Sequence, residues 1–331
     1  MKTPGMSNNS RRHFLRLVCS AIVLVVCHTK SGATQETGEP RQFLVESALV
    51  TVPVVVRDAQ GRFVKGLPPG SFKLFEDGRQ VPVSLFLASE DPIKIALLID
   101  TSRSATTVLK KIKKAAGQFL KQMRSQDLAM VASFDSEIRV LCALSSDARE
   151  LKEAIKGAKS GGAYTRMRDA IHEIVRGKSR SITGRKAIIL LTDGHDQGSR
   201  IAAKDLLDTL ASSNMPIYSI FYNVDPRALI KELFGIPTRF GGAGNSWKAQ
   251  EKEAAQYLDK ISDLSAGRLY TSDIKNLDEV FRQISEELRS QYLLGFYPEK
   301  SKLDGAAHTL VVSVSVPDAV VRSRRSYRAA P

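Results

Sequence analysis

Three short polar motifs carry the side chains of this sequence that are best suited to chemistry. They are Asp100-Thr-Ser102-Arg-Ser104, Gly161-Gly162-Ala-Tyr-Thr165 and Thr192-Asp193-Gly194. Their carboxylates and hydroxyls are hard oxygen ligands, which suit Mg²⁺ or Mn²⁺ and are poor ligands for zinc. No group of Cys and His residues has the spacing of a zinc site. The motifs therefore point to a divalent metal bound through oxygen.

Each motif adjoins an element that could position it at the edge of a sheet. Asp100 directly follows the almost continuous apolar run Ile93–Ile99, and Asp193 follows the apolar strand Ala187–Leu191. Thr165 begins a predicted helix. Ligands of open α/β sheets bind outside the carboxyl ends of the strands, so the three motifs are expected to meet there. Helix capping would explain any one of them, but not all three together.

Apolar strands and amphipathic helices alternate through the middle of the chain. This alternation predicts an α/β fold with a doubly wound, mostly parallel sheet, at roughly residues 91–290. The glycine-rich stretch Pro226–Trp247 interrupts it and is expected to be a surface loop or a partner-contact loop. Further expected strands are Leu128–Phe134, Ile217–Tyr222 and Arg268–Thr271. The expected helices are 108–123, one that contains 151–155, 165–175, 201–210, 254–264 and 276–291.

The two flanks of this region have β character. Asp77-Gly78 is a strong hairpin signal between Phe72–Glu76 and Val81–Leu87. Three strands alone make a poor domain, so the C-terminal strands of residues 291–331 are expected to pair with residues 43–89 in one small all-β unit. The other expected strands are Phe43–Arg57, Tyr292–Tyr297, His308–Val316 and Val320–Tyr327.

The N-terminus has the features of an export signal. Arg11-Arg12 precedes Phe14-Leu15 and the apolar run Leu17–Cys27, which predicts a signal peptide of the twin-arginine type over residues 1–33 and a linker over 34–42. An ordinary secretory signal is the alternative. Either signal implies a periplasmic, cell-surface or extracellular protein that meets the membrane only during export. Removal of the leader would leave Cys142 as the one cysteine, so no intramolecular disulfide is expected.

The charge is strongly basic, with 49 Lys+Arg against 35 Asp+Glu and a formal net charge of +14. Much of this charge is dispersed along helices, as a solvated helix face would be. Aromatic residues make up only 7% and are not interleaved with basic ones, so a nucleic-acid partner is not expected. Electrostatic binding of an acidic polymer stays open as an alternative, and it would weaken steeply with salt.

The three motifs together resemble the metal-ion-dependent adhesion site of von Willebrand factor type A domains, which have a Rossmann-like fold. In many family members the threonine directly follows Gly-Gly, whereas Ala163 and Tyr164 intervene here. Thr165-Arg-Met-Arg-Asp169-Ala-Ile171 nevertheless matches the usual continuation. The ligands that the resemblance implies for Mg²⁺ or Mn²⁺ are Asp100, Ser102, Ser104, Thr165 and Asp193.

The resemblance also implies a function in binding. Family members leave one metal position open for a partner's carboxylate, so we expect metal-dependent protein–protein interaction with a partner that exposes an acidic residue. The flanks, including Gln291-Tyr-Leu-Leu-Gly-Phe-Tyr297, resemble a group of exported type A proteins that is abundant in acidobacteria. A structural or assembly scaffold is an alternative. An enzyme is not expected: His195, Asp196 and Ser199 lie near the third motif, but no nucleophile elbow accompanies them.

Overall fold

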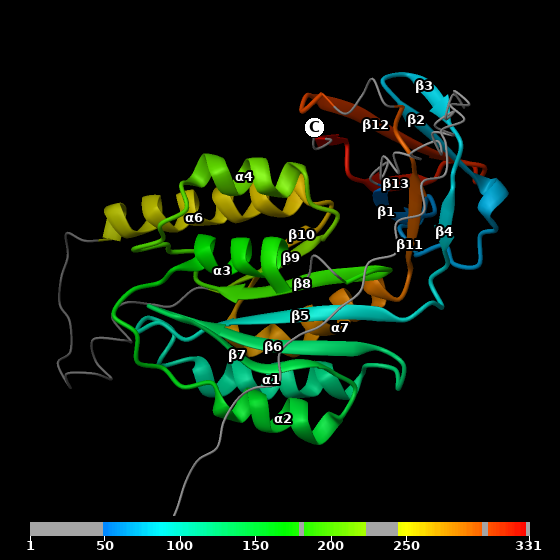
Figure 1. Cartoon of the computed structure of the whole chain (residues 1–331). Helices are drawn as coiled ribbons and strands as arrows, with labels where there is room; N and C mark the ends of the chain where they lie inside the picture. The colour runs from blue at the N-terminus through cyan, green and yellow to red at the C-terminus, as the bar shows by residue number, and fades with distance from the viewer. Residues whose placement is uncertain (1–48, 179–181, 223–243, 300–303, 329–331) are drawn as a thin grey trace, which may run out of the picture. The chain divides into compact units, whose positions relative to one another are not determined.

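A six-stranded sheet in the order β10-β9-β8-β5-β6-β7 forms the centre of the computed structural model (Figure 1). Every neighbouring pair is parallel except β6 and β7, which are antiparallel. The predicted doubly wound, mostly parallel sheet is therefore confirmed. The strands are β5 Ile93–Asp100, β6 Leu128–Phe134, β7 Ile138–Ser145, β8 Arg185–Thr192, β9 Ile217–Tyr222 and β10 Arg268–Ser272.

The structure describes residues 49–178, 182–222, 244–299 and 304–328. The expected signal peptide, the linker and most of the glycine-rich stretch lie outside these ranges. Within the described residues, no helix is both long and apolar enough to cross a membrane.

Helices cover both faces of the central sheet (Figure 1). Along β5, Ile95, Leu97 and Ile99 enter the core beneath one set of helices, while Ala96 and Leu98 enter the core on the opposite face. This alternation explains why the strand reads as an unbroken apolar run. The first face carries α1 Leu109–Lys121, α2 Ala148–Gly157 and α7 Leu277–Leu288, the last preceded by the short turn η3 Ile274–Asn276. The second carries α3 Met167–Glu173, which runs into the π-helical turn η2 Ile174–Lys178, together with α4 Ala203–Ala211 and α6 Gly244–Leu264.

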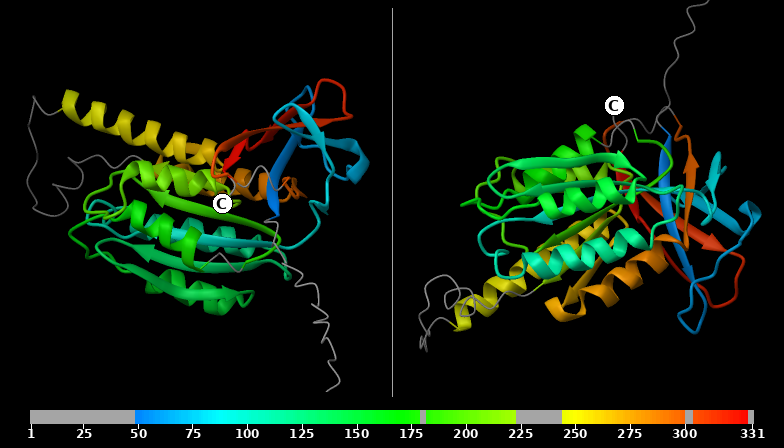
Figure 2. Two further views of the ribbon diagram at one scale, coloured as in Figure 1. Left: turned by 45° about the horizontal axis from the view of Figure 1, so that its top comes forward. Right: turned by 90° about the horizontal axis from the view of Figure 1, so that it is seen from below.

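The two flanks of the chain form a β-sandwich of two antiparallel four-stranded sheets, ordered β13-β1-β11-β4 and β14-β12-β2-β3. β1 pairs with β11, with Val54 opposite Tyr292, and β2 pairs with β12, with Leu74 opposite Val312. The expected pairing of the two flanks is thus observed, and Figure 2 shows β1 beside the C-terminal strands. The strands are β1 Val50–Arg57, β2 Phe72–Glu76, β3 Arg79–Val81, β4 Leu85–Leu87, β11 Gln291–Phe296, β12 Ala307–Val314, β13 Val320–Ser323 and β14 Ser326–Arg328, with the turn η1 Pro69–Ser71 before β2.

The Asp77-Gly78 hairpin forms as predicted, but its second strand is shorter than expected. Asp77 and Gly78 have φ angles of 47° and 79°, the left-handed conformation of a type I′ turn. Only Arg79–Val81 returns along β2, because Leu85–Leu87 leaves the hairpin and pairs with β11 in the other sheet. The expected single strand Val320–Tyr327 is likewise divided, into β13 and β14.

Arginine side chains join the sandwich to the α/β region. Arg185, at the start of β8, donates to the carbonyl oxygens of Ser89 and Asp91 ahead of β5 and to that of Leu288 at the end of α7. Arg324 donates to the carbonyl oxygen of Ala211 after α4. Burial lowers the pKa of Arg324 to about 10. These contacts tie both strand-rich flanks to helices of the central domain.

A histidine in the sandwich is expected to make stability depend on pH. His308 lies between two carboxylates, with Nδ1 2.9 Å from Asp77 Oδ2 and Nε2 3.2 Å from Asp304 Oδ1. Hydrogen bonds to these carboxylates raise the pKa of His308 above its usual value of 6.5. The stabilisation is therefore fully present below pH 6.5 and is lost as the pH rises through the raised pKa.

The urea midpoint of the wild type should fall between pH 6 and pH 9, and His308→Gln should largely remove this change. His172→Gln is a matched control, because the His172 ring has no hydrogen bond or ion pair in the described part of the chain. A pH dependence that survives His308→Gln would contradict the prediction.

Candidate metal centre

The three polar motifs meet at the carboxyl ends of the central strands. Asp100 is the last residue of β5 and Asp193 directly follows β8, the strand beside it. Isolated backbone bridges join Ser102 to Gly162 and Thr165 to Gln197, so the second motif lies against the loops of the other two. Four of the five predicted ligands are buried and the fifth, Ser104, is half-buried.

The first motif folds its polar atoms around Asp100. Asp100 Oδ1 accepts a hydrogen bond from the Ser102 amide at 2.9 Å, and Oδ2 accepts one from the Thr192 hydroxyl at 2.8 Å. The hydroxyl oxygens of Ser102 and Ser104 lie 3.0 Å apart. The carboxylate is thus held by β8 from one side, while two hydroxyls of its own loop stay close to each other.

The two aspartates bring two carboxylates into a buried site. Asp100 is fully buried and Asp193 is 3% exposed. Burial, together with the Asp193 carboxylate, raises the pKa of Asp100 to about 7. Two negative charges this close together are unfavourable in a buried site. A divalent cation would supply the missing positive charge, so the residues fit a metal of this kind.

The ligand set is rich in hydroxyls and poor in carboxylates. Within the described ranges, no three His, Cys, Asp or Glu side chains are grouped so that they could hold a metal. An ion at this edge would therefore need the hydroxyls of Ser102, Ser104 and Thr165 besides the two aspartates. Such a set suits Mg²⁺ or Mn²⁺ better than a softer metal.

The two residues that precede Thr165 do not displace it from this edge. Thr165 exchanges backbone hydrogen bonds of 3.0 and 2.9 Å with Gln197, in the loop after Asp193. Its own hydroxyl makes no hydrogen bond to any described residue. Tyr164 is turned outward, 55% exposed, and lies beside Gly198. The insertion thus places an aromatic ring at the rim, while Thr165 remains in the site.

Sequence reasoning missed Asp135, the residue that fixes the second motif. Asp135 follows β6 and is 1% exposed, and its carboxylate accepts hydrogen bonds from the Thr101 hydroxyl at 3.2 Å and from Arg139 at 3.0 Å. Gly162 packs so closely on Asp135 that any Cβ there would collide with the aspartate side chain. A signal was present, because Asp135 also directly follows a buried strand.

Residues around the third motif do not form a catalytic pair. The Ser199 hydroxyl donates to Asp196 Oδ2 at 2.7 Å, and the same oxygen accepts from the Arg168 amide. The His195 ring instead lies beside Trp247, with ring centroids 5.9 Å apart. In the described part of the chain, the Ser199 hydroxyl thus pairs with a carboxylate and not with an imidazole.

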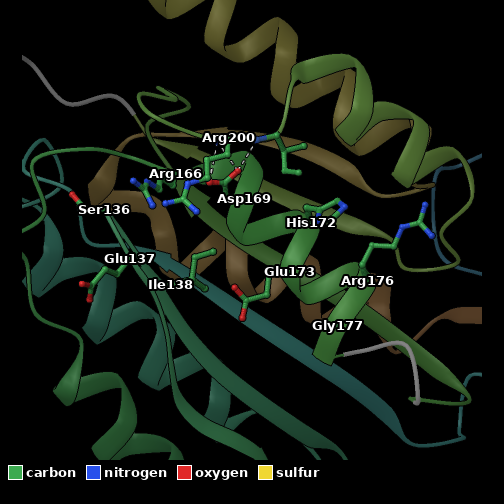
Figure 3. Close-up of a pocket in the computed structure, with 11 residues that line it drawn as sticks. Ser136, Glu137, Ile138, Arg166, Asp169, His172, Glu173, Arg176, Gly177 and Arg200 are labelled. Atoms are coloured by element: carbon green, nitrogen blue, oxygen red, sulfur yellow. Dashed lines mark hydrogen bonds between the residues drawn. The ribbon is translucent and has the colours of Figure 1, made fainter.

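A wide pocket of about 660 Å³ begins one residue beyond Thr165 (Figure 3). Arg166, Asp169 and Arg200 lie together at one end of it, and His172 and Arg176 lie toward the other. Asp169 accepts hydrogen bonds from the backbone amides of Arg200 and Ile201. Arg166 Nε is buried and has no hydrogen-bond partner among the described residues. The wall next to the site therefore carries the positively charged side chain of Arg166.

Comparison with protein families gives one match, to the von Willebrand factor type A domain, over residues 94–260. This region contains all five predicted ligands and includes the strands of the central sheet from β5 to β9. A comparison with curated proteins finds no match.

Solved structures with a similar fold include several type A domains. A von Willebrand factor type A protein from Catenulispora acidiphila is 14% identical, with 78% of this chain and 72% of that chain covered and a TM-score of 0.46. The domain of the type V pili tip protein Mfa5 from Porphyromonas gingivalis is 14% identical, with 59% and 94% covered and a TM-score of 0.41. Proximal thread matrix protein 1 from the mussel byssus, with a zinc-occupied MIDAS motif, is 13% identical, with 60% and 48% covered and a TM-score of 0.44. This chain thus spans about half the length of the mussel protein.

Proposed function

The chain belongs to the von Willebrand factor type A family, and from this premise we propose that it binds a protein partner through a divalent cation. The observation that carries the proposal is the buried pair Asp100 and Asp193, whose negative charges lie close together. A structural site would be more stable without such a pair. A site that binds a cation needs the two carboxylates as ligands.

Asp100, Ser102, Ser104, Thr165 and Asp193 would hold Mg²⁺ or Mn²⁺. When bound, the ion would supply an electrophilic position for a partner's carboxylate. Three of the five ligands are neutral hydroxyls, which withdraw little of the ion's charge. Asp100 is oriented for this role by the Ser102 amide and the Thr192 hydroxyl.

The surroundings of the site support a partner with an exposed acidic residue. Arg166 adjoins Thr165 and lines the neighbouring pocket, where its positive charge would attract a second acidic group. Tyr164 and Trp247 add aromatic surface near the same loops. Aromatic and arginine side chains are the types enriched in protein–protein interfaces.

The place of action belongs to the same proposal. We propose that residues 1–33 direct export, preferentially by the twin-arginine route, and that the protein works in the periplasm or outside the cell, like the exported acidobacterial proteins it resembles. The domain division, with the type A domain at 91–290 and a β unit from 43–89 and 291–331, also stands as a proposal. No enzymatic activity is proposed.

Asp193→Ala is expected to abolish Mg²⁺ binding while leaving the fold intact. Removing one of two like charges relieves the repulsion that raises the pKa of Asp100, and this offsets the lost hydrogen bond from the His195 amide at 3.1 Å. Isothermal titration of Mg²⁺ and Mn²⁺ into metal-stripped protein measures the affinity, and thermal unfolding in EDTA measures the fold.

Asp208→Ala serves as the control, because Asp208 is an exposed carboxylate on α4. The wild type and the control should bind one ion per chain, and the melting temperature of Asp193→Ala in EDTA should not fall. Equal Mg²⁺ affinity in all three proteins would show that Asp193 is not a ligand.

A further inference from the structure

We propose that the Tyr222 hydroxyl is an additional positioning group of the metal centre, which donates a hydrogen bond to an oxygen in the coordination shell of the ion. The oxygen is that of a water bound to the ion, because the hydroxyl makes no hydrogen bond to a described carboxylate, and the hydroxyl would orient this water. The inference rests on the proposed metal-dependent function and extends it to a residue outside the three motifs.

Strand register places Tyr222 next to Asp193. β8 and β9 are parallel neighbours, with Thr192 opposite Phe221, so the residues that follow, Asp193 and Tyr222, are also side by side. Side chains alternate between the two faces of a strand. Leu191 and Tyr222 belong to the same core, whereas Phe221 faces the opposite one. Asp193 is the residue directly after β8, and its carboxylate is one of the two whose charge acts on the Tyr222 hydroxyl.

The hydroxyl of Tyr222 has no function in the fold that the structure accounts for. Tyr222 is fully buried, and its oxygen has no hydrogen-bond partner in the described part of the chain. Buried hydroxyls are normally paired, because burial without a partner is unfavourable. Phenylalanine would fill the same space between the sheet and its helices without this cost. The hydroxyl therefore needs a partner that the described residues do not supply.

The surroundings of the hydroxyl identify that partner. Burial and the negative charges of Asp100 and Asp193 together raise the pKa of Tyr222 well above its usual value, so the phenol keeps its proton. A phenol is a hydrogen-bond donor, and the strand register places Tyr222 beside the predicted ligand Asp193. Groups that hydrogen-bond to metal ligands in this way orient them and strengthen metal binding.

Tyr222→Phe tests the proposal, with Tyr257→Phe as its matched control. The Tyr257 hydroxyl is also buried and without a partner among the described residues, but its charged neighbours are Arg168 and Asp196 instead of Asp100 and Asp193. Both substitutions remove one oxygen and keep the ring. Two quantities are measured for the full chain: the Kd for Mg²⁺ by isothermal titration and the melting temperature in EDTA.

Tyr222→Phe should weaken Mg²⁺ binding about tenfold, the lower end of the effect of such supporting groups. Its melting temperature in EDTA should be equal to that of the wild type or higher, and Tyr257→Phe should bind Mg²⁺ like the wild type. Unchanged affinity in Tyr222→Phe, with binding still lost in Asp193→Ala, would overturn this inference alone. A wild-type protein that binds neither Mg²⁺ nor Mn²⁺ would overturn the metal centre and this inference together.

Discussion

Glu287→Gln is expected to lower the free energy of unfolding by about 3 kcal/mol, since removing one partner of a buried ion pair leaves the other charge uncompensated. Glu287, on α7, is fully buried and pairs with three arginines. Arg322 of β13 forms the closest pair, while Arg57 of β1 and Arg268 of β10 lie 3.5 and 3.8 Å from the carboxylate. Glutamine keeps the shape of the side chain and removes its charge.

The position of this cluster makes the effect large. Arg57 and Arg322 belong to the sandwich, whereas Glu287 and Arg268 belong to the α/β region, so one carboxylate neutralises cations from both. Arg322 also donates to the carbonyl oxygens of Ala266 and Gly267 ahead of β10. Loss of the carboxylate should therefore weaken the attachment of the sandwich as well as α7 itself.

Urea unfolding of Glu287→Gln and of Glu286→Gln separates this effect from a general loss of charge on α7. Glu286 is half exposed and pairs with Arg282 on the surface of the same helix. Surface pairs contribute little, so Glu286→Gln should cost less than about 1 kcal/mol. Similar losses of stability in the two variants would mean that the buried Glu287 cluster contributes no more to stability than a surface ion pair.

Most of the central sheet could be predicted from sequence because buried parallel strands are marked by their composition. The apolar runs at Leu128–Phe134 and Ile217–Tyr222 coincide with β6 and β9. β7 was missed, because it is an edge strand whose side chains are mostly half-buried or exposed, including Arg139 and Val140. An edge strand has no continuous apolar run, and its place depends on pairing with β6, which the local sequence does not reveal.

The motifs of the site were also visible in the sequence, but their supporting residues were not. Asp100 and Asp193 could be found because they follow apolar runs, where a charged residue is conspicuous. Tyr222 is the last residue of such a run, and nothing local distinguishes a buried phenol from a buried phenyl ring. The position of its hydroxyl follows from the register of β8 and β9, which is a property of the fold.

A tight turn at the opposite end of β9 leads to the second large expected effect. Gly267 lies between α6 and β10, and its amide donates to the Ser262 carbonyl oxygen at 2.8 Å. A Cβ at this position would overlap the backbone of Ile217, the first residue of β9. Gly267→Ala should therefore lower the free energy of unfolding by about 3 kcal/mol, the upper part of the usual range for overpacking.

Moving the backbone to relieve the clash would be unfavourable, because both sides of the contact are held in place. The Ile217 amide donates to the Ser265 hydroxyl at 2.9 Å, and the Ile217 side chain is fully buried. Gly157→Ala is the matched control: a Cβ at Gly157, the last residue of α2, meets no atom within 4 Å, and alanine favours the helix. Chemical denaturation should show a large loss for Gly267→Ala and none for Gly157→Ala. Wild-type stability of Gly267→Ala would contradict this prediction. It would mean that the turn can move away from β9, and that the close packing of β9 against β10 is not required for the fold.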